Sequence, residues 1–253
     1  WAMGSQFQPR QKPDAFRASV ERVRQYIEAG DCYQANLSQE FSGHFTGDPW
    51  QAFQALSDAN PTPYSGFIRS GEASIISVSP ERFLEIHDRT VTTSPIKGTR
   101  PRGRTPETDL AYASELEGSE KDLAENLMIV DMMRNDFGRI ARVGTVQVPE
   151  LHTVECFPTV HQMVSSVVAE TDASLTEVFE STFPPASITG APKVSTSRII
   201  TDLETDGRGS YCGVAGLISP GLWPAEPCAR AVSCSSRSGA GAFPALRAPC
   251  WSG

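Results

Sequence analysis

The chain is organised around the stretch SPIKGTRPRGR, residues 94–104. This stretch holds two prolines, two glycines and four basic side chains. Proline and glycine interrupt regular structure, so we predict a tight loop with no helix or strand running through it. Its backbone N–H groups and positive charges can converge on an anion, although composition alone favours a solvated basic turn. The alternating sequence FLEIH at residues 83–87 predicts a strand that leads into it.

Lys97 makes this stretch a candidate catalytic site. A free lysine has a pKa near ~10.4, so about one amine in a thousand is uncharged at pH 7.4. Nearby cations and partial burial both lower a lysine pKa, and enzymes use this to make the amine nucleophilic. Arg100 and Arg102 follow Lys97 closely in the sequence and are the cations in question.

Length, charge and cysteine usage exclude several classes of protein. The 253 residues, 39% of them hydrophobic, can form one large domain or two small ones. The net charge of −8 argues against a broad nucleic-acid surface. We see no membrane span and no signal peptide. The six cysteines form no CxxC pair, which indicates reduced thiols in a cytoplasmic protein rather than zinc.

Periodicity and punctuation residues predict a mixture of helices and short strands. Val20, Val23 and Ile27 form an apolar stripe on the first helix, and Gly30 is its expected stop. We predict helices over residues 16–29, 49–57, 119–135, 175–183 and 194–203. We predict strands over residues 31–41, 67–68, 73–78, 83–86, 144–151, 159–168 and 209–218, and a polar loop over 107–118.

Asp122 and Glu125 are three residues apart in the helix that we expect Ser119 to open with a capping box. Leu123, Leu127 and Val130 are its expected buried stripe. The positive end of the helix dipole stabilises carboxylates in the first turns by ~0.3–1 kcal/mol, which explains both residues without a ligand. Paired carboxylates also suit Mg²⁺, so the sequence leaves a metal site open as the alternative.

Two further features each have a structural and a functional interpretation. The small residues of 184–193 precede a helix, where they form either a plain entry loop or a cradle for an anion. His161 stands in a predicted strand, and a single histidine there is more often a hydrogen-bonded core residue than a catalyst.

Six stretches together resemble the chorismate-utilising enzymes, in that family's order and spacing over about residues 15–219. Those enzymes include anthranilate, aminodeoxychorismate, isochorismate and salicylate synthases. The matching stretches are YIEAGD with Gln34 to Ser38, SPERF at 79–83, Pro95 to Gly103, ENLMIVDMMRND at 125–136, SITGAPK at 187–193 and Ser210 to Gly216. The resemblance implies an α+β chorismate-binding fold, like that of anthranilate synthase component I, with large, mostly antiparallel sheets and outer helices.

Two positions indicate a branch of the family. Lys97 is the residue type of aminodeoxychorismate synthases, whereas anthranilate synthases have alanine there. Gln34 stands where isochorismate and salicylate synthases have a lysine that activates water, so ammonia is the expected nucleophile. The resemblance thus implies component I of aminodeoxychorismate synthase, in 4-aminobenzoate and folate biosynthesis. Anthranilate synthase component I and an inactive remnant of the family are the alternatives.

The resemblance also implies a mechanism. Lys97 attacks C2 of chorismate, the 4-hydroxyl leaves, ammonia adds at C4 and Lys97 departs, with Glu81 as an acid–base partner. Ammonia comes from a glutamine amidotransferase subunit, component II. Mg²⁺ is the implied cofactor, with Glu125 and Asp122 as ligands. The implied substrate contacts are Gly98, Thr99, Thr189, Gly190, Tyr211 and Gln34.

The chain departs from the family pattern at both ends. We interpret residues 1–14 as an irregular lead and, because the chain opens on Trp1, expect a fragment. Residues 15–220 form a partial catalytic domain. Residues 221–253 lack the family's later arginine and glutamates and are typical of a shifted reading frame, so we do not expect the family's strands there.

Overall fold

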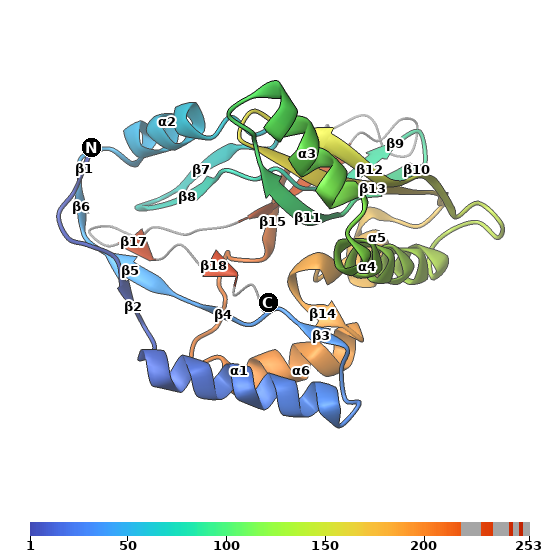
Figure 1. Cartoon of the computed structure of the whole chain (residues 1–253), viewed down its shortest axis with the longest axis horizontal. Helices are drawn as coiled ribbons and strands as arrows, with labels where there is room; N and C mark the ends of the chain where they lie inside the picture. Colours follow the sequence, from blue (N-terminus) through green and yellow to red (C-terminus); the bar gives the residue numbers. More distant parts are fainter. Residues whose placement is uncertain (219–228, 235–242, 245–247, 250–253) are drawn as a thin grey trace. The chain divides into compact units, whose positions relative to one another are not determined.

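The computed structural model describes residues 1–218, 229–234, 243–244 and 248–249 (Figure 1). Its contacts divide the chain into two compact units, each assembled from separate segments. Unit 1 comprises residues 1–80, 188–215 and 233–253, and unit 2 comprises residues 81–187 and 216–232. Both contain helices and antiparallel strands, which confirms the α+β prediction.

Unit 1 is built from short strands and three helices in its described part. The helices are α1 (Pro13–Glu28), α2 (Pro49–Ala59) and α6 (Lys193–Leu203). The strands are β1 (Ala2–Met3), β2 (Gln8–Pro9), β3 (Gln34–Ala35), β4 (Ser38–Gln39), β5 (Phe41–Gly43), β6 (Phe45–Thr46), β7 (Gly66–Ser70), β8 (Ala73–Ser77), β14 (Gly190–Ala191), β17 (Phe243–Pro244) and β18 (Ala248–Pro249).

Helices α1 and α6 lie side by side and share one apolar core (Figure 1). Val23 of α1 and Ile199 of α6 are buried in it with Cys32 and Leu37. The predicted stripe on α1 is confirmed at Val23, whereas Ile27 is exposed. Gly30 ends the helix with a φ of +81°, a conformation that glycine adopts readily, so the predicted stop is confirmed.

Unit 2 is built on one large sheet. Its elements are β9 (Arg82–His87), β10 (Thr90–Ser94), β11 (Ile96–Pro101), α3 (Pro106–Glu117), α4 (Glu120–Gly138), β12 (Gln147–Cys156), β13 (Val160–Glu170) and α5 (Leu175–Thr182). Three elements contain residues of both units, namely η1 (Ala186–Ile188), β15 (Gly213–Ile218) and β16 (Ala229–Cys234). The strand order is β11-β13-β10-β9-β16-β15, and β12 also pairs with β13.

The basic stretch is a strand in the structure, so the predicted loop was wrong. Strand β11 covers Ile96–Pro101 and pairs antiparallel with β13. The pairing register shifts between Ile96 and Thr99, where Gly98 has a φ of +88°. A glycine bulge lets a strand pass through a sequence that otherwise reads as a turn.

The predicted polar loop over 107–118 is helix α3, another correction. Thr105 and Thr108 hydrogen-bond to each other's backbone N–H as a capping box, and Pro106 occupies the first turn. Leu116, near the C-terminal end of α3, is fully buried and anchors that end of the helix. Helices α3 and α4 pack against β11 and β13, where they cover the strand that carries Lys97 (Figure 1).

The two ends of the chain contain strands that the sequence did not predict. Within residues 1–14, β1 pairs with β6 and β2 with β5, because backbone pairing needs no apolar pattern. In the tail, β16 pairs antiparallel with β9, although the sequence there has no strand periodicity. The remaining predictions for residues 219–228, 235–242, 245–247 and 250–253 lie outside the described residues.

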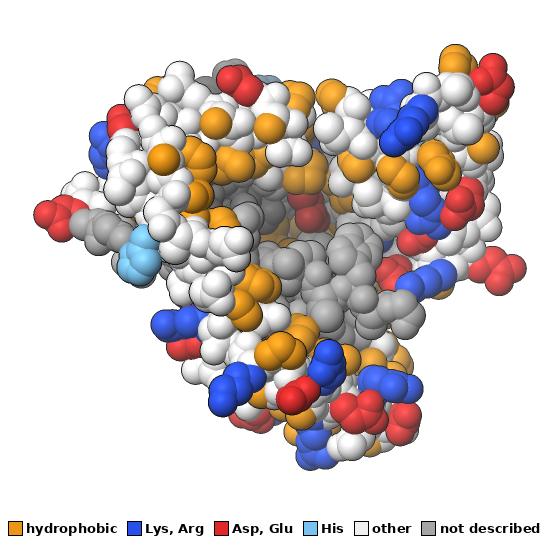
Figure 2. Space-filling model, turned by 60° about the vertical axis from the view of Figure 1, so that its left-hand side comes forward, with side chains coloured by type: hydrophobic (Ala, Val, Ile, Leu, Met, Phe, Trp, Pro, Cys, Tyr) orange, Lys and Arg blue, Asp and Glu red, His pale blue; other side chains and the backbone are white. Residues whose placement is uncertain are grey.

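No helix among the described residues is long and apolar enough to cross a membrane. Several large apolar side chains are exposed, and Figure 2 shows them interspersed with basic and acidic ones on the face in view. Scattered apolar exposure of this kind is normal for globular domains.

Candidate functional site

Lys97 and Glu81 meet at Ser187 within unit 2. The Lys97 ammonium, on β11, donates a hydrogen bond to the backbone carbonyl of Ser187 with an Nζ–O distance of 2.9 Å. The Glu81 carboxylate accepts hydrogen bonds from the Ser187 hydroxyl and from the backbone N–H of Ile96. The structure therefore brings together the two predicted catalytic residues around a third residue that is itself buried.

Desolvation raises the pKa of Glu81. The Ser187 hydroxyl, the positive charge of Lys97 and the Ile96 N–H all act in the opposite direction, but they do not outweigh it. The residue keeps some exposed surface while its carboxyl group is closely surrounded by protein. A carboxyl group in these surroundings is suited to hold and deliver a proton nearer neutral pH than a free glutamate.

Gly98 and Thr99, two predicted substrate contacts, follow Lys97 on β11. A Cβ atom on Gly98 would lie 2.8 Å from Leu116 Cδ1 and 3.0 Å from Asp122 Cβ, so the position requires glycine. Thr99 is opposite Gln162 of β13. The bulge at Gly98 brings β11 into close contact with α3 and α4, which fixes the strand beside Lys97.

Arg100 and Arg102, which follow Lys97, are paired with carboxylates. The expected loop with unpaired cations at these two positions is therefore corrected. Arg100 donates to Glu115 and Asp122, both at 2.9 Å. Arg102 forms a two-pronged ion pair with Asp109, at 2.8 Å and 2.7 Å. These pairs hold the end of β11 against α3 and α4.

Asp122 and Glu125 both lie on α4, but the described residues supply no complete metal site. Asp122 is buried and its Oδ2 accepts the bond from Arg100, whereas Glu125 is partly exposed. No group of three or more His, Cys, Asp or Glu side chains within the described ranges could hold a metal ion. Mg²⁺ keeps several waters and is commonly bound by one or two carboxylates together with substrate oxygens, so Glu125 and Asp122 fit it as a partial ligand set. In this structure the Oδ2 atom of Asp122 is paired with Arg100.

Gln34, Thr189 and Gly190 lie together in unit 1. Strand β3 pairs with β14, which sets Gly190 opposite Ala35. Gly190 has a φ of +134°, and a Cβ there would be 2.2 Å from the carbonyl oxygen of Gln34. The Thr189 carbonyl accepts the N–H of Asn36 at 2.8 Å. The Oε1 atom of Gln34 is buried and has no hydrogen-bond partner among the described residues.

Tyr211 is linked to this group through Arg208, also in unit 1. The guanidinium of Arg208 stacks over the Tyr211 ring at 5.7 Å and donates to the Ile188 carbonyl at 2.8 Å. Burial raises the pKa of Tyr211, so its hydroxyl keeps its proton and can donate a hydrogen bond. Arg208 is itself held by Glu204 through bonds of 2.9 Å and 2.7 Å.

Sequence reasoning missed Arg208 and Glu204 and gave Ser187 no role. Glu204 and Arg208 are opposite charges four residues apart, but they follow the end of α6 at Leu203, so the helical spacing rule does not predict their pairing. Ser187 stands in the SITGAPK motif, but nothing local indicates that its carbonyl meets a lysine 90 residues away. His161 was interpreted as a hydrogen-bonded core residue, and this is confirmed, since it is buried with both ring nitrogens partnered.

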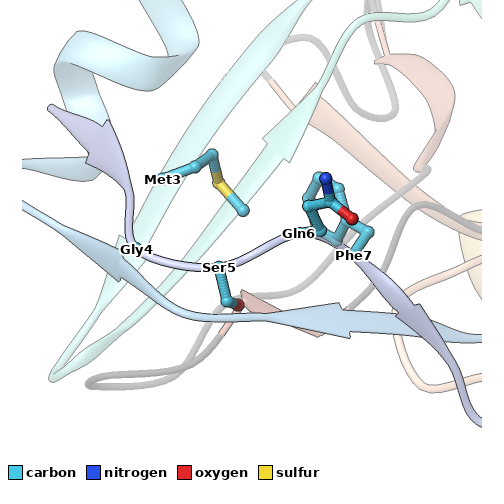
Figure 3. A pocket seen from close by; sticks show the side chains of 5 residues that line it. All are labelled: Met3, Gly4, Ser5, Gln6 and Phe7. Carbon is cyan, nitrogen blue, oxygen red and sulfur yellow. The ribbon is translucent and has the colours of Figure 1, made fainter.

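A separate cavity of about 550 Å³ lies in unit 1, away from every predicted site residue of that unit in sequence. It is lined by consecutive residues that run from β1 toward β2 (Figure 3). These residues are Met3, Gly4, Ser5, Gln6 and Phe7. None of these five side chains is charged or titrates near neutral pH, so these residues offer no acid–base chemistry.

Comparison with known proteins identifies relatives of this chain. The chain is 47% identical to "Aminodeoxychorismate synthase component 1" of Klebsiella aerogenes over 216 residues, which cover 81% of this chain and 48% of the relative. It is 40% identical to "Anthranilate synthase component 1" of Thermus thermophilus, over 85% of this chain and 47% of the relative.

The fold is shared with anthranilate synthase component I from Streptococcus pneumoniae, a crystal structure. That structure superposes with a TM-score of 0.84 at 33% identity, covering 94% of this chain and 53% of that one. The chain thus spans about half the length of the curated relatives it matches. Residues 2–222 match the family model described as chorismate binding enzyme. On this evidence the chain belongs to the family of chorismate-binding enzymes.

Proposed function

We propose that this chain carries catalytic residues of an aminodeoxychorismate synthase component 1, which aminates chorismate. The observation that carries the proposal is the convergence of Lys97 and Glu81 on Ser187 in unit 2. Identity supports the same branch, at 47% to the Klebsiella aerogenes relative against 40% to the anthranilate synthase component of Thermus thermophilus.

In the proposed reaction, the uncharged amine of Lys97 attacks C2 of chorismate. The N–C2 bond forms, the C4–O bond breaks, and the departing hydroxyl takes a proton and leaves as water. Glu81 is the proposed proton donor, because its raised pKa keeps the proton available. Ammonia then forms a bond to C4 and Lys97 is released. The Ser187 carbonyl orients the Lys97 nitrogen before the attack.

The proposal includes a requirement for Mg²⁺, as in the family. Glu125 is the first candidate ligand because its side chain is partly exposed, and Asp122 is the second. Asp122 would have to release Arg100 before it could bind a cation. When bound, the ion would neutralise the substrate's carboxylates. The proposal also includes a glutamine amidotransferase subunit that supplies ammonia, and a cytoplasmic location.

The direct test compares two products. A tail-replaced version, in which residues 221–253 give way to the continuation of the Klebsiella aerogenes relative, is incubated with chorismate, ammonium and Mg²⁺. We expect 4-aminobenzoate to appear only after a lyase for aminodeoxychorismate is added. Anthranilate as the sole product would instead support the second candidate, an anthranilate synthase component 1, and would overturn the proposal.

The chain as it stands is the matched control in this test. Residues 221–253 lack the arginine and glutamates that the family resemblance implies there, so we expect little or no turnover. Omission of Mg²⁺ from the reaction of the tail-replaced version should also abolish product. Turnover without a divalent cation would contradict the cofactor requirement.

A further inference from the structure

A chain of three polar side chains lies beside β11 in unit 2 and has no part in the proposed reaction. Cys156, the last residue of β12, is directly opposite His161 of β13. The Cys156 sulfur is 3.2 Å from His161 Nδ1. On the other edge of the ring, His161 Nε2 is 2.9 Å from Oδ1 of Asp109, on α3. The order is thiol, imidazole, carboxylate, as in activated nucleophiles.

The environment of Asp109 determines which ring nitrogen carries the proton. The hydrogen bonds from the Arg102 side chain, the backbone N–H of Gly103 and His161 hold the pKa of Asp109 far below its usual range. The carboxylate is therefore ionised and can only accept a hydrogen bond. When the ring is neutral, His161 donates through Nε2, and the lone pair of Nδ1 then faces the Cys156 thiol.

The thiol is accessible although its partner is not. Cys156 is exposed, whereas His161 is 1% exposed and held on both sides, so the imidazole cannot turn away. The positive charge of Arg102 interacts favourably with the ionised form of the thiol. Cys32 and Cys212, the other cysteines whose side chains the structure describes, are buried. The cluster holds one thiol that solvent-borne reagents can reach.

We propose that Cys156 is a reactive thiol that small electrophiles modify, with His161 as its proton acceptor and Asp109 as the residue that positions His161. The proton of the thiol moves to His161 Nδ1, and the sulfur attacks the electrophilic carbon of an alkylating agent. The S–C bond forms, the bond to the leaving group breaks, and the leaving group departs with the electron pair as an anion. His161 then returns its extra proton to water.

The expected acceleration follows from the fraction of thiolate. A free thiol is about 3% ionised at pH 7, so the reactive thiolate is scarce in an unassisted cysteine. A neighbouring base that takes the proton as the sulfur attacks removes part of this limit. We expect Cys156 to react about tenfold faster than an unassisted exposed cysteine.

The test uses the full chain and iodoacetamide at pH 7, with mass spectrometry of tryptic peptides to follow each cysteine separately. The reference is a synthetic peptide of residues 150–159, which contains the same thiol without His161 or Asp109. We expect Cys156 of the folded chain to react about tenfold faster than the peptide, and Cys32 and Cys212 to react far more slowly than either. An equal or lower rate for Cys156 would overturn the proposal.

Variants identify the proton acceptor. His161→Gln should return the rate to that of the peptide, and Asp109→Asn should give an intermediate rate because the amide no longer fixes the tautomer. His87→Gln, an exposed histidine of β9, is the matched control and should leave the rate unchanged. If His161→Gln does not fold, as judged by circular dichroism, the comparison of the parent chain with the peptide still decides the question. A folded His161→Gln variant that reacts as fast as the parent would contradict the proposal.

Discussion

Two carboxyl groups of unit 2 have opposite pKa shifts because their surroundings differ. Desolvation dominates at Glu81, where one hydroxyl, one N–H and a lysine do not offset it, and the pKa is raised. At Asp109, hydrogen bonds from Arg102, Gly103 and His161 dominate and the pKa is lowered. The first group is suited to proton delivery, and the second to a permanent negative charge beside an imidazole.

The raised pKa of Glu81 predicts a specific dependence of stability on pH. The folded state holds this proton more tightly than the unfolded state, so the free energy of unfolding falls as the pH rises above about 4.5, the ordinary glutamate pKa. The side chain of Glu81→Gln cannot ionise, so this contribution to the fall in the free energy of unfolding is absent from the variant. Urea denaturation at several pH values should therefore show the variant gaining stability relative to the parent as pH rises from 4 to about 7.

An exposed glutamate provides the control for this prediction. Glu72, between β7 and β8, is exposed, and Glu72→Gln should give a difference from the parent that stays flat over the same range. A Glu81→Gln variant that loses stability relative to the parent with rising pH would mean that its hydrogen bonds and Lys97 outweigh desolvation.

At this scale the sequence names candidate site residues but does not reveal their contacts. Lys97 and Glu81 stand in motifs that the family shares, so the resemblance could name them. Their meeting at Ser187 depends on a carbonyl 90 residues from Lys97, which no local pattern reveals. The Cys156–His161–Asp109 chain was missed for the same reason, since α3 brings Asp109 to β13 only in the folded chain.

The elements show where local patterns fail. The sequence of β11 was interpreted as a loop because it contains glycine and proline. In the structure a single bulge at Gly98 accommodates the glycine, so the strand continues through it. Of the predicted stripe on α4, Val130 is buried and Leu123 is partly buried, but Leu127 is exposed, while Asn126 and Asp136 are buried. Apolar periodicity cannot predict which polar residues are buried in a helix that packs on a sheet.

By contrast, α1, α2, α5, α6 and β7 to β9 follow their predicted ranges closely. Asp48 and Ser174 cap α2 and α5 through their side chains, and proline stands at the start of α1 and α6.

The end of α6 offers a test at the scale of one element. Glu204 caps this helix and accepts hydrogen bonds from the N–H and hydroxyl of Ser38 at 2.9 Å and 2.8 Å. Its ion pair with Arg208 is nearly enclosed, with side chains 5% and 15% exposed. Glu204→Gln leaves Arg208 without its charge partner, so we expect a loss of about 3 kcal/mol in the free energy of unfolding.

The matched control is an ion pair on the surface of α1. Arg24 and Glu21 are both more than half exposed, and Glu21→Gln should cost less than about 0.5 kcal/mol. Both variants are measured by chemical denaturation at neutral pH. Equal effects of the two substitutions would show that enclosure adds nothing to the Glu204–Arg208 pair.

The family resemblance implies one partial catalytic domain over residues 15–220, followed by a tail of different character. The contacts of the folded chain form two units, each assembled from segments that are distant in sequence. Glu81, Lys97, Gly98, Thr99, Asp122 and Glu125 belong to unit 2, and Gln34, Thr189, Gly190 and Tyr211 belong to unit 1. Local periodicity cannot predict such interleaving, because long-range pairings such as β3 with β14 determine it.

The amination rate of Lys97→Ala in the tail-replaced version tests the central claim most directly. Chorismate, ammonium, Mg²⁺ and an added lyase are supplied in excess, and 4-aminobenzoate is measured over time. Lys12→Ala, an exposed lysine before α1, is the control and should match the parent. We expect Lys97→Ala to be at least about a hundredfold slower, since it has no amine to attack C2. Amination by Lys97→Ala at the rate of the control would contradict the account.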